Sequence, residues 1–304
     1  MRIVLAGGTG QIGRVLAREF TDADVVVLGR NGPLKWDGRT LGPWTEALEG
    51  ADALINLAGR SVDCRYTPAN RHAIMYSRVA STHVLRDALE RASDPPKVWL
   101  QSSTATIYAH TYGPAHDEEH GVLGGVEPNL PDTWRFSLDV ARAWEEAAYG
   151  APVRTVFMRS AMVMSPDRGG VFDTLLGLVR RRLGGRAGHG RQYMSWIHDV
   201  DFGRAIRLLI ERDDLSGPVN LASPNPLPYA QFMRALREAA GVGFGLPSTR
   251  LMLEVGAFLM RTETELVLKS RRVVPGRLLD VGFSFKHPDW REAARDLVSR
   301  YPIG

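Results

Sequence analysis

Four glycines near the N-terminus have the spacing of a phosphate-binding turn. Gly7, Gly8, Gly10 and Gly13 follow a short apolar run, Arg2–Ala6, and precede an amphipathic stretch. A strand, a glycine turn and a helix in this order are the context in which such glycines bind the pyrophosphate of a dinucleotide. Gly7 would allow a tight turn, Gly10 would admit phosphate close to the backbone, and Gly13 would allow close helix packing. A turn without a ligand is the alternative, which this context disfavours.

The end of the next apolar run indicates which dinucleotide would bind. Asp24–Gly29 is expected to form the second strand, and it ends in Gly29-Arg30 with no acidic residue. An acidic side chain at this point would bind the ribose hydroxyls of NAD, whereas a guanidinium can bind the 2′-phosphate of NADP(H). The sequence therefore favours NADP(H), and the alternative is that Arg30 is an ordinary surface arginine.

Hydroxyl groups follow another expected strand, Lys97–Gln101. Ser102, Ser103 and Thr104 come directly after it, where an open parallel sheet places its ligand. These hydroxyls are well placed to bond a substrate oxygen, although serine and threonine are also common turn formers. A further strand, Ala51–Gly59, is expected to end beside the glycine turn.

Two polar clusters suggest other kinds of site. His110, His116 and His120 lie in one loop with neighbouring acidic residues, but their spacing matches no metal-ligand motif, so we predict a polar surface loop and no metal. The basic run Arg180–Arg182 lacks interleaved aromatics and a recognition motif. We therefore expect a solvated face and no nucleic-acid partner.

The composition is that of a soluble globular protein of 304 residues, with 44% hydrophobic and 24% charged residues and a net charge of +4. Its single cysteine, Cys64, allows no internal disulfide and fits a reducing compartment. The short apolar run before Gly7 is not a signal peptide, and no run is long enough to span a bilayer. We expect a cytoplasmic protein with no membrane partner; a homodimer is compatible with the sequence.

The order of expected elements predicts an α/β fold. Strands alternate with helices in the first half, including a long helix over Arg71–Arg91, and a helix-rich, proline-punctuated tail follows from Pro224. We predict a Rossmann-type, doubly wound parallel sheet with a smaller, mainly helical C-terminal substrate lobe. Residues 1–165, with 195–223 returning to it, would form the dinucleotide-binding domain, and residues 166–194 and 224–304 the lobe.

By its motifs the chain resembles the extended short-chain dehydrogenase/reductase superfamily, which includes nucleotide-sugar epimerases. It is most similar to an atypical, epimerase-like branch with a C-terminal domain of unknown function. The resemblance covers essentially the whole chain and is carried by Gly7–Gly13, Asn56–Gly59, Ser102–Thr104 with Ile107-Tyr108, Ser77–Val79, Trp144-Glu145, Gly190–His198 and Val273–Leu279 with Gly282-Phe283.

The resemblance implies a set of site residues. Thr104 matches the catalytic serine or threonine of the superfamily. The cofactor-binding residues would be Gly7, Gly10, Gln11, Ile12, Gly13, Gly29, Arg30, Leu57, Ala58, Gly59 and Arg78.

The chain departs from the superfamily at its acid–base pair. The superfamily carries a tyrosine, and four residues later a lysine, on the helix after the Thr104 strand. Alignment on Trp144-Glu145 places Ser137 and Ala141 at these positions, a state that the atypical branch shares. A proton would then come from the substrate lobe, from water or from the substrate itself, with Tyr108 and His198 as nearby candidates.

Two functions from different classes fit this sequence. The first is an NADP(H)-dependent oxidoreductase or epimerase-like enzyme acting on a small molecule. The second is a non-catalytic NADP(H)-binding protein that senses redox state or regulates a partner. The retained Thr104 favours the enzyme, since a hydroxyl beside a nicotinamide has little use in a sensor.

Overall fold

A parallel seven-stranded sheet forms the centre of the molecule. The structure is a computed structural model that describes residues 1–248 and 265–302. The strand order is β10-β6-β5-β4-β1-β2-β3, with every neighbouring pair parallel. This order confirms the predicted Rossmann-type sheet, because the chain reverses direction across the sheet between β1 and β4. The strands are β1 (Arg2–Ala6), β2 (Asp24–Gly29), β3 (Leu34–Lys35), β4 (Ala53–Asn56), β5 (Val98–Thr104), β6 (Arg154–Ser160) and β10 (Gly217–Leu221).

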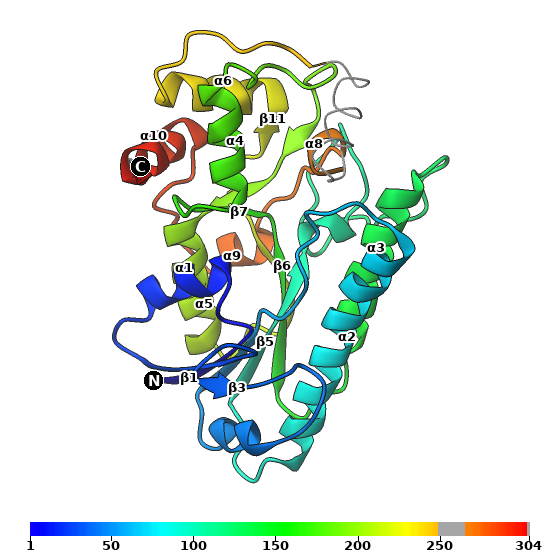
Figure 1. Cartoon of the computed structure of the whole chain (residues 1–304), viewed down its shortest axis with the longest axis vertical. Helices are drawn as coiled ribbons and strands as arrows, with labels where there is room; N and C mark the ends of the chain where they lie inside the picture. The colour runs from blue at the N-terminus through cyan, green and yellow to red at the C-terminus, as the bar shows by residue number, and fades with distance from the viewer. Residues whose placement is uncertain (249–264, 303–304) are drawn as a thin grey trace.

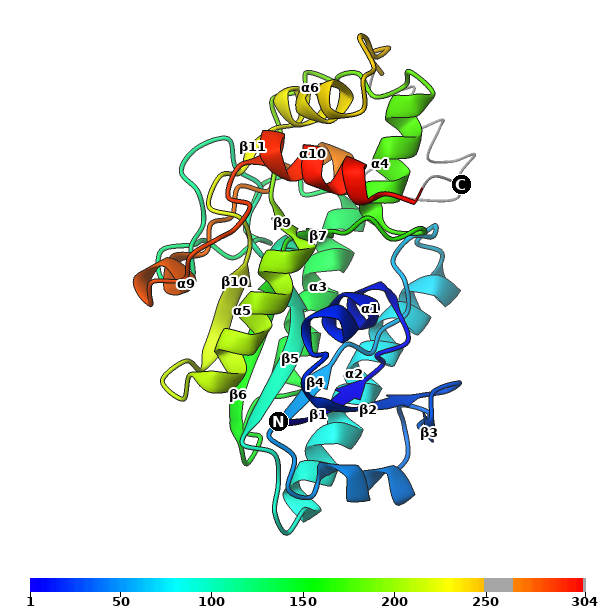
Figure 2. The ribbon, with the colours of Figure 1, turned by 90° about the vertical axis from the view of Figure 1, so that its left-hand side faces the viewer.

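Helices cover both faces of this sheet (Figures 1 and 2). Helices α1 (Gln11–Glu19) and α5 (Asp199–Glu211) lie on one face. Helices α2 (Pro68–Arg91) and α3 (Asp132–Glu146) lie side by side on the other. Two 3₁₀ helices, η1 (Pro43–Leu48) and η2 (Ala105–Ile107), follow β3 and β5.

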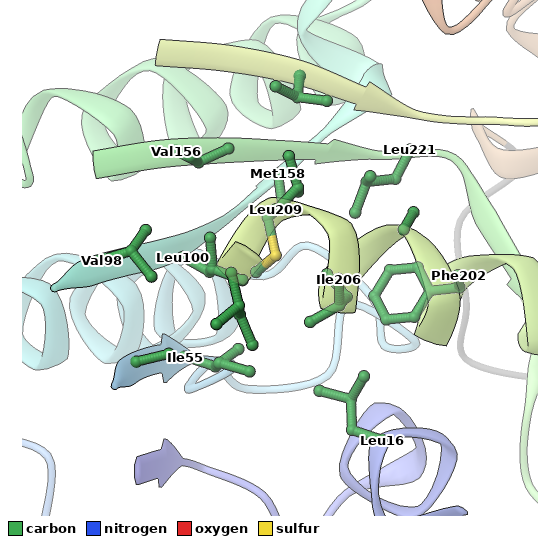
Figure 3. Close-up of a cluster of buried hydrophobic side chains, with 14 of the residues drawn as sticks. Leu16, Ile55, Val98, Leu100, Val156, Met158, Phe202, Ile206, Leu209 and Leu221 are labelled. Carbon is green, nitrogen blue, oxygen red and sulfur yellow. The ribbon is translucent and has the colours of Figure 1, made fainter. Parts of the chain in front are cut away.

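Alternation along each strand builds the first core, which has one layer of apolar side chains on each face of the sheet. In β1, Ile3 and Leu5 pack toward α1 and α5, whereas Val4 packs toward α2. Figure 3 shows the α5 side, where Val98 and Leu100 of β5 meet the apolar residues of the helix. Because both faces are buried, the strands read as continuous apolar runs. This is why the sequence located them.

A second core lies above the sheet, in the part of the chain predicted as the substrate lobe. Helices α4 (Val171–Arg180), α6 (Tyr229–Ala239) and α10 (Trp290–Arg300) enclose it. At its centre Trp290 stacks on Phe232 at 3.9 Å between ring centroids and meets Trp196 edge-on at 4.9 Å. Aromatic pairs of this kind add roughly 0.5–1.5 kcal/mol beyond their buried area.

Short elements connect the two parts. β7 (Met162–Met164) pairs with β9 (Trp196–His198), and β8 (Tyr193–Met194) pairs with β11 (Leu227–Pro228). Helices α8 (Glu265–Leu268) and α9 (Gly276–Asp280) precede α10. The sequence did not predict these paired strands, since two or three residues carry no periodicity.

In its described residues the predicted tail contains four helices, α6, α8, α9 and α10, together with strand β11 and the loops between them. Its residues 249–264 and 303–304 lie outside the described part, so the expectation for them stays a prediction, as does the exact division into two domains. No helix among the described residues is long and apolar enough to cross a membrane.

Candidate nucleotide-binding and active site

A cleft of about 850 Å³ opens at the point where the strand order reverses. Open α/β sheets bind their ligands at this point, outside the carboxyl ends of the strands. Seven of the predicted cofactor residues line the cleft, and they come from the loops that follow β1, β2 and β4: Gly7, Gly10, Gly29, Arg30, Leu57, Ala58 and Gly59.

The glycine turn has the geometry that a phosphate site needs. Gly7 has a φ of +77°, and a Cβ there would lie 2.8 Å from the Ala58 Cα atom. A Cβ on Gly13 would lie 1.8 Å from the carbonyl oxygen of Gly8, so the absence of a side chain at Gly13 allows the turn to pack closely against helix α1. Gly10 differs, because a Cβ there would meet no atom within 4 Å. Gly10 therefore faces open cleft and leaves room for a phosphate group.

Helix α1 begins at this turn with its N–H groups unsatisfied by any side-chain cap. The side chains of its first two residues point elsewhere. Gln11 Nε2 donates to Ser165 Oγ at 2.9 Å, and Ile12 packs against the core. A role for these two residues in cofactor binding, through their backbone N–H groups, stays a prediction. The Gln11 side chain ties the turn to the chain after β7.

Among the described residues, three arginines line the cleft: Arg30, Arg39 and Arg60, of which Arg60 donates to Asn70 Oδ1 at 2.8 Å. Arg30 is exposed and lines it as predicted. Arg39, which the sequence analysis missed, lines the same cleft and lies 5.1 Å from the ring centroid of Tyr76 on α2. Asp37 also lines the cleft, but its carboxylate accepts hydrogen bonds from the backbone N–H groups of Arg39 and Thr40. These hydrogen bonds lower the pKa of Asp37.

The loop after β4 is held from two sides. Asn56 Oδ1 accepts from the Ala58 N–H at 3.0 Å, and Asn56 Nδ2 donates to Gln101 Oε1 at 2.9 Å. On the other side, Arg78 Nη1 donates to the Arg60 carbonyl at 3.0 Å, and a Cβ on Gly59 would lie 3.1 Å from Arg78 Cζ.

Arg78 thus supports the loop from behind. Its guanidinium lies 4.7 Å from the ring centroid of Trp144, and burial lowers its pKa to about 10. It is not among the residues that line the cleft. A direct contact between Arg78 and a cofactor stays a prediction.

Thr104 is the last residue of β5, half-buried, and its Oγ1 accepts from the Thr106 N–H at 3.2 Å. The strand beside it is anchored by a buried network. Ser103 Oγ donates to Glu145 of α3, and Arg159 of β6 forms a bidentate ion pair with the same carboxylate at 2.9 Å. This network fixes the backbone from which Thr104 projects.

The two sequence candidates for a proton donor lie in buried hydrogen-bond networks. Tyr108 is buried, its hydroxyl donates to Asn220 Oδ1 at 3.0 Å, and burial raises its pKa. His198 is also buried, and burial lowers its pKa to about 4. Its Nε2 lies 3.0 Å from Asp296 Oδ2 and 3.1 Å from Arg300 Nη2. The Tyr108 hydroxyl also accepts from Arg159 Nη1 at 3.1 Å, so Tyr108 belongs to the network that anchors the strand of Thr104. His198 makes its contacts with α5 and α10.

The histidine loop differs from the predicted polar surface loop. His116 is buried, with Nε2 donating to the Ala109 carbonyl and Nδ1 accepting from the Val122 N–H, both at 3.1 Å. Burial lowers its pKa. Only His120 of the three is exposed, beside Asp117. In the described part of the chain, the His/Asp group close enough to share a cation is instead His198, His287 and Asp296, and Arg300 already contacts it.

A segment from the C-terminal part lies against the strand end and helix α3. Glu265, Lys269 and Arg271 are all buried. Ser137 Oγ donates to Glu265 Oε2, Lys269 Nζ donates to the Thr106 carbonyl at 2.8 Å, and Arg271 Nε donates to Thr106 Oγ1 at 3.2 Å. Sequence analysis missed these residues, because contacts spanning more than 120 positions leave no local pattern.

Comparison with known proteins gives the family. The model of the "NAD dependent epimerase/dehydratase family" matches residues 3–222, and that of a domain of unknown function, DUF1731, matches residues 250–297. An epimerase family protein of Staphylococcus epidermidis is 29% identical over 98% of this chain and 99% of its own length.

Solved structures agree. The human epimerase family protein SDR39U1 (isoform 2), solved with NADPH, has a TM-score of 0.83 and 26% identity, over 99% of this chain and 100% of that one. A nucleoside-diphosphate sugar epimerase from Corynebacterium glutamicum has a TM-score of 0.76 and 26% identity, over 98% of this chain and 58% of that one. With its Rossmann-type sheet, its glycine turn and the match over residues 3–222, the chain belongs to the NAD dependent epimerase/dehydratase family.

Proposed function

We propose that this protein is an NADP(H)-dependent oxidoreductase or epimerase-like enzyme that acts on a small molecule carrying a carbonyl or hydroxyl group. The observation that carries this proposal is the cleft itself. It combines a glycine turn open at Gly10, the N-terminus of α1 and the side chains of Arg30 and Arg39. The turn suits a pyrophosphate, and the arginines suit a 2′-phosphate.

The residues present fit NADP(H) better than NAD. The only carboxylate that lines the cleft among the described residues is Asp37, and backbone N–H groups already occupy it. The similarity to the human protein solved with NADPH supports the same cofactor. When bound, the cofactor would supply or accept a hydride.

Thr104 gives the proposed enzyme a group that can contact a substrate oxygen. Its Oγ1 accepts from the Thr106 N–H, and no acceptor for its own hydroxyl hydrogen is found in the described part of the chain. This hydroxyl can therefore donate to a carbonyl oxygen placed at the end of β5, and so polarise it.

The first test is binding followed by turnover. We expect NADPH to bind, as measured by the fluorescence of its nicotinamide, and to be oxidised when 4-nitrobenzaldehyde, 2,3-butanedione or methyl pyruvate is added. We expect Thr104→Val to lower turnover and leave NADPH affinity unchanged. A protein that binds NADPH but oxidises it with none of these compounds would instead be a non-catalytic NADP(H)-binding protein.

A further inference from the structure

Three ionisable side chains of one C-terminal segment are buried against the end of β5 and helix α3. Glu265 and Lys269 are 3% and 0% exposed, and Arg271 is 8% exposed. A buried ionised group costs several kcal/mol unless it is paired and hydrogen-bonded. The burial of three such side chains in one segment therefore calls for an explanation. Glu265 contacts Ser137 of α3, whereas Lys269 and Arg271 contact Thr106, two residues after Thr104.

Glu265 makes its contacts at the position where the superfamily has its tyrosine. Ser137 Oγ donates to Glu265 Oε2, and Arg271 Nη2 lies 3.2 Å from Glu265 Oε1. The carboxylate therefore lies against the Ser137 side chain. Arg271 compensates its charge from the other side.

A second anchor fixes the segment to the strand end. Arg271 Nε donates to Thr106 Oγ1 at 3.2 Å, and Lys269 Nζ donates to the Thr106 carbonyl at 2.8 Å. Thr106 is the residue whose N–H bonds Thr104 Oγ1. One short path thus links Glu265, through Arg271 and Thr106, to the Thr104 hydroxyl.

From this arrangement we infer that Glu265 is the proton-transfer group of the site, positioned by Ser137 and Arg271. This inference rests on the proposed oxidoreductase function. In the oxidation of a secondary alcohol, the Glu265 carboxylate accepts the hydroxyl proton while the carbinol carbon gives its hydride to the cofactor and the C–O bond becomes a double bond. In reduction, the carbonyl carbon gains the hydride, its oxygen gains the Glu265 proton, and water reprotonates the carboxylate.

Lys269 is the competing donor in the same segment. Burial lowers its pKa to about 8, with a further contribution from Arg271, so an ammonium there could also give up a proton. Its Nζ, however, donates to a backbone carbonyl rather than to Ser137. Among the described residues, the charged and titratable groups around Glu265 include Arg271 and Lys269, with Tyr66 close to Arg271 and Glu127 close to Lys269.

The turnover experiment compares Glu265→Ala with wild type, with 4-nitrobenzaldehyde, 2,3-butanedione and methyl pyruvate as probes. We expect a roughly 10²–10⁴-fold loss of turnover, unchanged NADPH affinity, and partial recovery on addition of sodium formate, which returns a small carboxylate to the space left by the side chain. A merely structural role would not be restored by formate. Ser137→Ala, which keeps the carboxylate but loses its donor, should lower turnover less and should not respond to formate.

A second measurement needs no substrate. The oxidised nicotinamide is cationic, so a nearby carboxylate favours NADP⁺ over NADPH. We expect Glu265→Gln to reduce NADP⁺ affinity relative to NADPH by roughly threefold or more, and Arg271→Gln to change the ratio in the opposite direction. Asp132→Asn removes an exposed carboxylate from the same helix as Ser137 and serves as the matched control, with no change expected.

The outcomes separate the two proposals. An active wild type whose Glu265→Ala variant stays within twofold of it overturns the inference alone, and so does a loss found in Lys269→Met but not in Glu265→Ala. An NADP⁺/NADPH ratio that Glu265→Gln leaves unchanged also overturns it. A wild type that binds NADPH and reduces none of the probes overturns the proposed function, and the proton-transfer role with it.

Discussion

At the scale of single residues, Arg30 and Arg39 both line the cleft, and we propose that their guanidinium groups bind one phosphate of the cofactor. Arg30 follows β2 directly and is the residue that the sequence identified. Arg39 reaches the same cleft from the loop after β3, where its side chain lies against the Tyr76 ring. Arginine is suited to both contacts, since a planar guanidinium can stack on a ring and bind phosphate through its N–H groups.

The first prediction concerns cofactor choice. A charge-assisted hydrogen bond contributes roughly 1.5–3 kcal/mol, so wild type should prefer NADPH over NADH by roughly tenfold to hundredfold. We expect Arg30→Ala to lose most of this preference and Arg39→Ala part of it, as measured by fluorescence titration of both cofactors. Equal affinities of wild type for NADPH and NADH would contradict the prediction. A preference that survives Arg30→Ala and disappears in Arg39→Ala would move the phosphate to the second arginine.

A second prediction contrasts two glycines of the same turn. Gly10 has a φ of −84°, which valine can adopt, and a Cβ there meets open space. Gly10→Val should therefore abolish NADPH binding and change the free energy of unfolding by less than about 1 kcal/mol. Gly13→Val should lower stability as well as binding, because its Cβ would collide with the Gly8 carbonyl. Urea unfolding and NADPH titration of both variants provide the check, and a Gly10→Val protein with normal affinity would refute the site.

At the scale of elements, His198 joins three of them. It ends β9, precedes α5 and contacts α10 through Asp296 and Arg300. Its Nδ1 accepts from the Val200 N–H, and its ring stacks on His287 at 3.8 Å between centroids. Burial, which is the largest cause, lowers its pKa to about 4; the positive charges of His287 and Arg300 act in the same direction, and the carboxylates of Asp199 and Asp296 oppose them. The contact between β9, α5 and α10 is thus formed around the neutral imidazole of His198.

The third prediction follows from this neutral state. An unfolded histidine has a pKa of about 6.5, so unfolding takes up a proton between that pH and about 4. The contribution of His198 to stability is complete above pH 6.5 and is lost as the pH falls toward 4. We expect a loss of roughly 2 kcal/mol between pH 7 and pH 5, measured by urea unfolding. His198→Asn should flatten this slope; an unchanged slope would show that other groups cause it.

Sequence patterns predicted some elements well and others not at all. The strands around Ile3, Leu100 and Val156 were found because a strand buried on both faces is apolar throughout. The end of β5 was placed three residues early, since Ser102–Thr104 read as a turn although they continue the ladder with β6. The paired strands at His198 were missed because they are only three residues long.

The sequence likewise predicted some residues of the candidate site and missed others. The residues of the glycine turn and Arg30 are local in sequence, so spacing alone identified them. Glu265 could not be identified from the sequence, because its contact with Ser137 spans 128 positions. Arg39 was missed for another reason, since a cation on a loop has no pattern that distinguishes it from a solvated one. Only the fold brings these side chains to the cleft and to the strand end.

At the scale of the whole molecule, the apolar core around the sheet is separate from the apolar core of the C-terminal part. The clusters that flank the sheet include Ile3 and Leu54, whereas the C-terminal cluster is built around Trp290 and Phe232. Charged contacts connect the two parts. Arg18 of α1 forms ion pairs with Asp167 at 2.8 Å and Asp199 at 3.3 Å, and Arg300 of α10 binds the same Asp199 at 2.6 Å.

The fourth prediction tests how independent these cores are. Trp290 is buried, and its Nε1 donates to the Phe232 carbonyl at 2.9 Å. Trp290→Ala should lower the free energy of unfolding of the C-terminal part by roughly 3–5 kcal/mol, while NADPH affinity measured below the unfolding transition stays within twofold of wild type. Urea unfolding followed by fluorescence, with a parallel NADPH titration, provides the measurement. A tenfold weaker NADPH affinity would show that the cleft depends on the second core.

The position of Glu265 in the C-terminal part also has a consequence in time, during synthesis of the chain. The sheet is complete at Leu221, and Glu265 follows 44 residues later. At roughly 5–20 residues per second, adding them takes about 2–9 s. Through this interval the growing chain already holds the glycine turn, Arg30 and Arg39, but not the carboxylate inferred to move the proton. Each newly made molecule would thus acquire the residues of its cleft before the residue inferred to transfer the proton.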